Sequence, residues 1–227
     1  MTRTIDLDGV SVDYGNRLAL RSVTTRLDAH RIAVIGANGS GKSTFARLLN
    51  GLELPTSGSI RVHGLDPVRE GKQLRRRVGF VFTNPDAQIV MPTVAEDVAF
   101  SLRGRGLSKS EIAGRVASVL SDNGLADHAD APAHSLSGGQ KQLLAICSVL
   151  VTEPELLVAD EPTTLLDAAN TRRIADLLAG LPQQVVLVTH NLRLAERCDI
   201  ALLFDGGQLI EQGNPADVVG RYEREFA

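Results

Sequence analysis

The chain has 227 residues, of which 43% are hydrophobic, so it can bury the core of one domain with an inserted subdomain. Its net charge is −3, and its most basic run is the short cluster Arg75-Arg76-Arg77. This charge balance argues against a surface that follows the phosphates of a nucleic acid.

Neither a membrane span nor a secretory leader is expected. No stretch approaches the roughly 18 continuous apolar residues that a bilayer span requires. The first residues, 1–6, lack the apolar core of a signal peptide. Cys147 and Cys198 lie in apolar, helix-like settings without metal-ligand spacing, which predicts reduced, non-catalytic thiols of a cytosolic protein. If the protein works at a membrane, it is therefore predicted to do so through another subunit.

The first third of the chain is expected to be rich in strands. Alternating or continuous apolar residues predict strands at Ile5–Asp13, Leu18–Leu27, Ile32–Ile35, Ser59–His63 and Val78–Thr83. The basic cluster directly precedes the last of these, so we interpret it as a solvated approach to that strand.

The strand Ile32–Ile35 leads into a glycine-rich loop that matches the P-loop pattern at every defined position. The loop reads Gly36-Ala37-Asn38-Gly39-Ser40-Gly41-Lys42-Ser43-Thr44. Its glycines let the backbone approach a phosphate closely, and its N–H groups point inward at the start of the next helix. Lys42 is predicted to reach the terminal phosphates, and the Ser43 hydroxyl to bind magnesium.

Helical periodicity replaces the strand pattern between residue 92 and about residue 152, and strands then return. Helices are predicted at Ala95–Leu102, at Ser108–Asn123 with Ser108 as its cap and Glu111 completing a capping box, and after Gly138-Gly139. Beyond Pro154, strands at Leu156–Ala159, Val185–Thr189 and Ile200–Phe204 alternate with helices at Ala168–Ala179 and Leu192–Arg197. This alternation predicts an α/β fold with a parallel-sheet core and a helical insertion.

Two carboxylates and a histidine are expected at the phosphate end of that sheet. Asp160 ends an apolar strand, where it would hold magnesium, and Glu161 would polarise the attacking water. An Asp-Glu pair alone is more often a strand end and a solvated turn. His190 closes another strand, where the usual role is a cap or a surface residue; beside a P-loop, a γ-phosphate sensor or a water-orienting group is favoured.

A second glycine-rich turn, Leu136-Ser137-Gly138-Gly139-Gln140, offers another anion-binding nest at a helix start. An ordinary helix start capped by Ser137 would show the same sequence pattern. Because the chain also carries the P-loop, the Asp-Glu pair, Leu166-Asp167 and His190, it resembles the nucleotide-binding subunit of ATP-binding cassette (ABC) transporters over nearly its whole length.

That resemblance implies a fold, ligands and partners. The fold would be a P-loop NTPase core, about 1–85 and 154–227, with an N-terminal antiparallel β-subdomain and a helical subdomain at about 92–153. ATP and Mg²⁺ would bind, with Tyr14 stacking on adenine. The turn of residues 136–140, the family signature, would cap the ATP held by the P-loop of a second subunit. Membrane partners would be a transmembrane coupling subunit and a separate substrate-binding subunit, with this chain peripheral on the cytoplasmic face and no nucleic acid bound.

The segment after Val78 points to one branch of the family. Most members have Gln where this chain has Thr83, whereas Asn84-Pro85-Asp86 with Gln88 resembles the ATPases of energy-coupling-factor vitamin and metal uptake, most closely those of biotin uptake. There a short extra helix follows the loop. A Thr would reach magnesium only through water, so Gln88 is a candidate replacement as metal ligand.

Several alternatives stay open at this point. Asp86, Glu96 and Asp97 are predicted to dock an arginine of the membrane partner, although Glu96 and Asp97 could equally complement their own helix dipole. An ABC ATPase acting on DNA, ribosomes or chromosomes would need coiled coils, zinc modules or a second cassette. A nucleotide switch without turnover is opposed by Glu161 and His190. The solute and the choice between a homodimer and a heterodimer are not determined.

Overall fold

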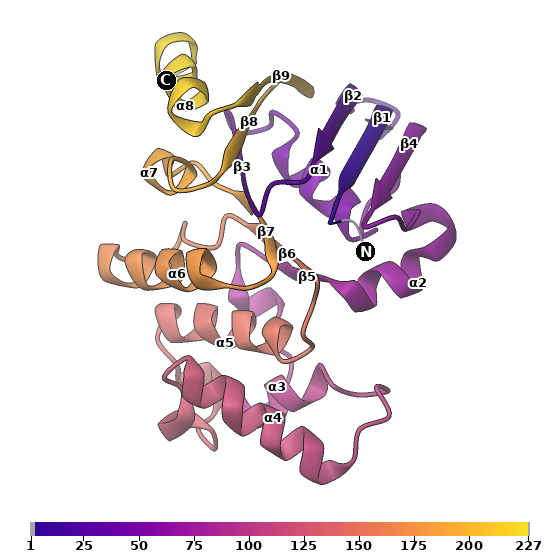
Figure 1. The fold of residues 1–227 in the computed structure, drawn as a ribbon. Helices are drawn as coiled ribbons and strands as arrows, with labels where there is room; N and C mark the ends of the chain where they lie inside the picture. Colours follow the sequence, from indigo (N-terminus) through magenta and orange to yellow (C-terminus); the bar gives the residue numbers. More distant parts are fainter. Residues whose placement is uncertain (1–2, 227) are drawn as a thin grey trace.

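The computed structural model describes residues 3–226, which form two β-sheets and a group of helices at one end of the molecule (Figure 1). The strands are β1 (Ile5–Asp13), β2 (Leu18–Leu27), β3 (Arg31–Ile35), β4 (Ser57–Val62), β5 (Val78–Val81), β6 (Leu156–Asp160), β7 (Gln184–Val188), β8 (Ile200–Asp205) and β9 (Gln208–Gly213). The α-helices are α1 (Lys42–Leu49), α2 (Pro67–Arg77), α3 (Val94–Phe100), α4 (Lys109–Asp122), α5 (Gly138–Leu150), α6 (Ala168–Gly180), α7 (Leu192–Ala195) and α8 (Pro215–Glu225).

The larger sheet places the ends of its central strands at one edge. Its order is β5-β6-β7-β3-β8-β9, with β5 to β8 parallel and β9 antiparallel to β8. Strands β6 and β7 are buried at every position because helices cover both faces, which explains their continuous apolar runs. The carboxyl ends of β3 and β6, followed by the P-loop and Glu161, therefore meet at the edge where such sheets bind ligands.

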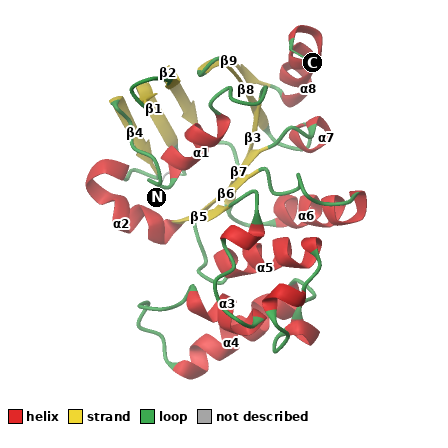
Figure 2. Cartoon of the chain, turned by 180° about the vertical axis from the view of Figure 1, so that it is seen from behind, coloured by secondary structure: helices red, strands yellow, loops and turns green. Residues whose placement is uncertain are grey.

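The smaller sheet is antiparallel, in the order β2-β1-β4, and packs against the same core. Helix α1 lies between the two sheets in Figures 1 and 2. Its Phe45 is fully buried and meets Phe204 of β8 with ring centroids 5.2 Å apart. This packing fixes the helix that follows the P-loop against both sheets.

Helices α3, α4 and α5 form the far end of the molecule (Figure 2). Their apolar faces share a second core with one face of the large sheet. The predicted capping box of Ser108 and Glu111 is present at the start of α4, and a matching box of Ser137 and Gln140 begins α5. The α/β class with an antiparallel β-subdomain and an inserted helical part is confirmed.

Three parts of the fold were not predicted. The largely exposed cluster Arg75-Arg76-Arg77 does directly precede β5, as predicted, but it forms the last turn of helix α2, which was missed; Asp66 caps that helix and Pro67 opens it. The hairpin strand β9 and the C-terminal helix α8 were also missed. Helix α8 begins in the same way, with Asn214 as the cap and Pro215 at the first helical position.

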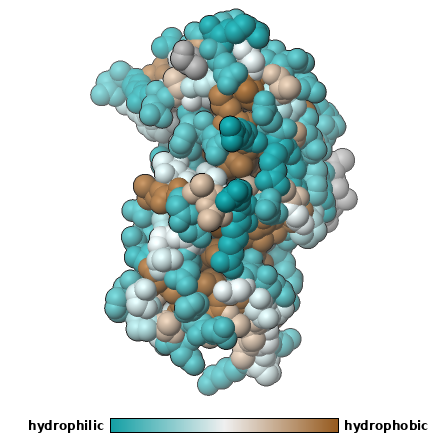
Figure 3. All heavy atoms as spheres, turned by 90° about the vertical axis from the view of Figure 1, so that its left-hand side faces the viewer, coloured by the Kyte–Doolittle hydropathy of each residue, from teal (hydrophilic) through white to brown (hydrophobic). Residues whose placement is uncertain are grey.

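The surface is mixed in character. Brown apolar patches interrupt the hydrophilic surface along the middle of the face shown in Figure 3. Between residues 3 and 226, no helix combines the length and apolarity needed to cross a membrane.

Candidate functional site

The P-loop joins β3 to α1 through glycines in conformations that other residues rarely adopt. Gly36, Gly39 and Gly41 have φ of 143°, 79° and 104°. A Cβ at Gly36 would lie 2.0 Å from the carbonyl oxygen of Phe204, so the loop can pass β8 only without a side chain. Gly41 is the N-cap of α1 and supplies no side-chain cap, which leaves the first N–H groups of the helix free to receive an anion.

Two polar side chains inside the loop are buried and suited to a bound phosphate. The Lys42 ammonium donates to the carbonyls of Gly36 at 2.7 Å and Ala37 at 2.9 Å. Burial lowers the pKa of Lys42, and the nearby Glu161 and Asp160 carboxylates, which raise it, offset this only in part. The Ser40 hydroxyl is buried without a hydrogen-bond partner, so it is suited to bond a phosphate oxygen.

Two of the three predicted magnesium ligands, Ser43 and Asp160, lie together. Ser43 Oγ donates to Asp160 Oδ1 at 3.0 Å, and Thr83 Oγ1 donates to the Asp160 backbone carbonyl at 2.9 Å. Burial raises the pKa of the Asp160 carboxyl, partly offset by the Ser43 hydrogen bond. A hydroxyl and a carboxylate suit Mg²⁺, which takes oxygen ligands and fills the rest of its octahedron with phosphate and water.

Consistent with so sparse a ligand set, no group of three or more His, Cys, Asp or Glu side chains that could hold a metal occurs within the described residues.

Glu161 is held in a strained conformation against His190. Its φ is +55°, a region that non-glycine residues seldom occupy, and its N–H donates to the carbonyl of Val188 at 3.0 Å. Its Oε2 lies 2.7 Å from His190 Nδ1 and accepts from Thr164 Oγ1 at 3.0 Å. The Glu161 side chain is 15% exposed and that of His190 57%. A base within hydrogen-bonding reach of an orienting group is the arrangement that activates water.

Pockets flank the P-loop on two sides. One is lined by Tyr14, Arg17, Ala19, Asn38, Gly39, Gly41, Lys42, Ser43, Thr44 and Glu161. The other is lined by Gly36, Ala37, Asn38, Thr83, Glu161, Thr164, His190 and Tyr222. Glu161 and Asn38 border both, so a ligand on the P-loop would be within reach of the carboxylate from either side.

Tyr14 stands at the rim of the first pocket as a half-exposed ring. Its hydroxyl donates to Glu53 Oε2 at 2.6 Å, and desolvation together with that carboxylate raises the pKa of Tyr14. Arg17, which donates to the Gly39 carbonyl at 2.9 Å, Thr164 and Tyr222 were not predicted. The position of Thr164 three residues after Glu161, within hydrogen-bonding reach across a turn, was the one local signal that could have identified it.

The signature turn, residues 136–140, lies away from the P-loop of its own chain. None of its residues lines either pocket beside the P-loop in the described part of the chain. A Cβ at Gly138 would meet nothing within 4 Å, whereas one at Gly139 would lie 2.3 Å from Asn170 Cγ on α6. The turn therefore has one open glycine and one packed glycine.

Gln88 follows the short 3-10 helix η1 (Pro85–Ala87) and its amide is engaged elsewhere. Its Oε1 accepts from the N–H of Phe82 at 3.1 Å, and its Nε2 donates to the carbonyl of Ala145 at 3.1 Å. The side chain ties the loop after β5 to α5 and does not line the pockets beside the P-loop. Its predicted role as a metal ligand stays a prediction, and it would require both hydrogen bonds to break.

The predicted acidic docking cluster does not form one surface. Asp97 is 2% exposed and accepts from the N–H groups of Val90 and Met91 and from Ser148 Oγ, so its assignment as a docking residue is wrong. Glu96 completes the capping box of α3 with Thr93, so it supports the start of its own helix, which was the alternative to docking. Asp86 is exposed and pairs with Lys141 at 2.8 Å.

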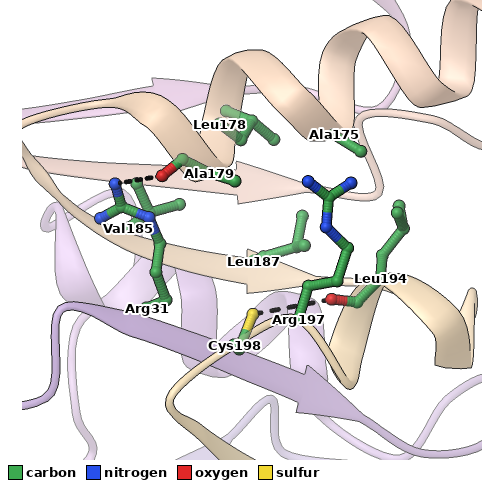
Figure 4. A pocket seen from close by; sticks show the side chains of 9 residues that line it. All are labelled: Arg31, Ala175, Leu178, Ala179, Val185, Leu187, Leu194, Arg197 and Cys198. Carbon is green, nitrogen blue, oxygen red and sulfur yellow. Dashed lines mark hydrogen bonds between the residues drawn. The ribbon is translucent and has the colours of Figure 1, made fainter.

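A small apolar cavity lies at the opposite edge of the large sheet (Figure 4). Its lining includes Arg31, which begins β3, whereas the P-loop follows the end of that strand. Its volume of about 30 Å³ is too small for a nucleotide. Burial raises the pKa of Cys198, which lines it, to about 11 and that of Cys147 to about 12, so both thiols stay protonated and unreactive near neutrality.

Comparisons with known proteins agree with this geometry. A family model described as ABC transporter matches residues 21–164. A putative ABC transporter ATP-binding protein of Deinococcus radiodurans is 49% identical over 222 residues, covering 98% of both chains. The biotin transport ATP-binding protein BioM of Rhizobium etli is 45% identical over 223 residues, covering 98% of this chain and 99% of that protein.

Solved structures show the same fold. CbiO1 of Clostridium perfringens, part of an ABC transporter complex, superposes with a TM-score of 0.85 at 33% identity, covering 97% of this chain and 92% of that one. A dimeric ATP-binding cassette in a post-hydrolysis state with ADP and Pi superposes with a TM-score of 0.82 at 28% identity, covering 93% and 98%.

Proposed function

Because the chain belongs to the ABC transporter family of ATP-binding proteins, we propose that it powers an uptake transporter of the energy-coupling-factor type, with biotin as the solute. The family membership makes it an ATPase. The name of the Rhizobium etli relative supports biotin, and the segment after β5 supports the energy-coupling-factor branch. A cobalt or nickel importer is the second candidate, favoured by the likeness to CbiO1.

One observation carries the catalytic proposal: the contact of Ser43 with Asp160 and the contact of Glu161 with His190 both lie at one P-loop, to which Ser43 belongs and whose two neighbouring pockets Glu161 lines. Tyr14 would stack on adenine, the loop N–H groups and Lys42 would bind the phosphates, and Ser43 and Asp160 would hold magnesium. Bound magnesium would neutralise charge on the β- and γ-phosphates. Lys42 would give up its hydrogen bonds to the loop carbonyls for bonds to phosphate oxygens.

Glu161 is the base in this proposal. Its carboxylate would accept the proton of the attacking water, and His190, 2.7 Å away, would keep it aimed and stabilise charge at the γ-phosphate. The strained backbone of Glu161 points in the same direction, because such strain persists where the surrounding structure fixes a residue for a task.

The site would be completed by a second subunit, a homodimer being the simplest arrangement because this chain carries every motif. Ser137, Gly138, Gly139 and Gln140 of one copy would meet the γ-phosphate held by the P-loop of the other. The phosphate charge would then join the copies, and hydrolysis would release them. The similar cassette with ADP and Pi is dimeric, which supports pairing of two copies.

Transport would require membrane partners. We place the chain on the cytoplasmic face of the membrane, bound to a transmembrane coupling subunit and, through it, to a separate substrate-binding subunit. Movements of the helical part, about 92–153, against the core, about 1–85 and 154–227, would transmit nucleotide state to that partner.

A phosphate-release assay tests the catalytic part. The purified chain should hydrolyse ATP, more so with its membrane partners. Glu161→Gln should retain ATP binding and lower turnover by roughly two to four orders of magnitude, the usual contribution of a general base. Near-normal turnover would remove Glu161 from that role. The solute is tested separately: the complex purified through tagged membrane subunits should retain biotin, and retained Co²⁺ or Ni²⁺ would favour the second candidate.

A further inference from the structure

Gln140, the last residue of the signature turn, is held at both ends of its side chain. Its Oε1 accepts from the N–H of Ser137 at 2.9 Å, and its own N–H donates to Ser137 Oγ at 3.4 Å. The other end of the amide, Nε2, lies 2.9 Å from Nε2 of His128. Sequence reasoning assigned His128 no role.

The direction of these bonds is fixed by chemistry. The Ser137 N–H can only donate, so the amide oxygen of Gln140 must face it and the NH₂ group must face His128. The His128 Nε2 must then accept, which requires a neutral ring with its proton on Nδ1. A proton on Nε2 would set two donors against each other and push the amide away from Ser137.

His128 is carried by a rigid frame. It ends the 3-10 helix η2 (Ala126–His128), which follows the fully buried Leu125. The carbonyl of Ala129, the next residue, accepts from the N–H of Ala95 at 2.9 Å on α3. The backbone that carries the ring is therefore anchored to α3, and the ring itself contacts Gln140 in the first turn of α5.

We propose that His128 is a positioning residue for the signature turn. By accepting from Gln140, it keeps that amide on the Ser137 N–H and leaves the Ser137 hydroxyl proton and the open Gly138 free for the phosphate of the other copy. This inference rests on the proposed function, in which the turn completes a site in trans. Without the bond to His128, the Gln140 amide can swing away and leave the cap of α5 half made.

The experiment compares three substitutions in the full chain. His128→Phe keeps the ring and removes the acceptor, whereas His128→Gln places an amide oxygen near the position of Nε2. The exposed His134, on the neighbouring η3 (Ala133–Ser135), supplies the matched control His134→Phe. His128→Phe should lower kcat about three- to ten-fold, the worth of one hydrogen bond, and His128→Gln should restore most of it. His134→Phe should behave as wild type.

Two further readouts separate positioning from folding. Binding of a fluorescent ATP analogue to the single copy should be unchanged in His128→Phe, because the P-loop binds it. In a Gln140→Ala background, His128→Phe should have no further effect on kcat, since its partner is gone.

An unchanged kcat in His128→Phe, an equal loss in His128→Gln, or the same loss with and without Gln140 would each overturn the inference. A wild-type chain that neither hydrolyses ATP nor pairs in its presence would instead remove the proposed function, and this inference with it.

Discussion

Gly138 and Gly139 are adjacent in the signature turn, yet the structure predicts opposite consequences for an added methyl group. A Cβ at Gly138 meets nothing within 4 Å, whereas a Cβ at Gly139 would lie 2.3 Å from Cγ and 2.4 Å from Oδ1 of Asn170. The Asn170 side chain is held by one hydrogen bond, which its Nδ2 donates to Asp167 at 3.0 Å. Gly139→Ala must therefore separate α5 from α6, or turn the Asn170 amide aside and break that bond.

The size of the effect follows from comparing the two alanine variants. Overpacking of this kind lowers the free energy of unfolding by about 1–3 kcal/mol, and replacing a helical glycine by alanine raises it by up to about 1 kcal/mol at either position. The helix term cancels in the comparison, so Gly139→Ala should be about 1–3 kcal/mol less stable than Gly138→Ala. For a domain of this size that corresponds to a melting temperature roughly 2–12 °C lower.

Thermal unfolding and ATPase rates together test this reasoning. Asn170→Ala should rescue the stability of Gly139→Ala by removing the obstructing side chain. Gly138→Ala should melt no lower than wild type and still hydrolyse ATP more slowly, because its methyl group faces the incoming phosphate. Equal melting temperatures for the two alanine variants would refute the packing argument, and full activity in Gly138→Ala would refute the role of the open face.

Three other predictions follow from the same site. Burial raises the pKa of Asp160, so the ionised carboxylate destabilises the nucleotide-free fold. Without magnesium, Asp160→Asn should therefore melt at a higher temperature than wild type near pH 7, and this difference should shrink as the pH falls and Asp160 takes up its proton. A lower melting temperature for the variant near pH 7 would contradict this. Cys147 and Cys198, with pKa values of about 12 and 11, should react with a maleimide far more slowly in the folded chain at pH 8 than in urea, and equal rates would show exposed thiols. Thr164→Val removes the hydroxyl bonded to Glu161 and should lower kcat about three- to ten-fold with ATP binding intact, so an unchanged kcat would deny Thr164 any part in aiming the carboxylate.

The sequence predicted the position of the P-loop, between a strand and a helix, and the buried strands of the core because both depend on local signals. The loop is a contiguous pattern, and the buried strands β6 and β7 are continuous apolar runs. The capping box of Ser108 and Glu111 spans three residues and could be read directly. The proximity of Asp160 to Ser43 followed from the rule that parallel strands end at one edge.

Features that depend on contacts between distant segments were not predictable. From the sequence, Asp97 is expected to be an exposed acidic residue in the first turn of a helix. It is buried instead, because Ser148, 51 residues later, and two loop N–H groups donate hydrogen bonds to it. The basic run at Arg75 suggested no helix because its cap, Asp66, lies nine residues earlier. His128 meets Gln140 only because η2 folds back against α5.

The claim that a site is built from two copies is tested most directly by mixing two inactive variants. Glu161→Gln removes the base but leaves its signature turn intact. Gly138→Asp leaves the base intact and places a negative charge that repels phosphate at the open glycine, where an added Cβ has no neighbour within 4 Å. A mixed pair contains one site with an intact P-loop, Glu161 and signature turn. ATPase activity in the mixture well above the average of the separate variants is the predicted result, whereas activity equal to that average would show that no site is shared between copies.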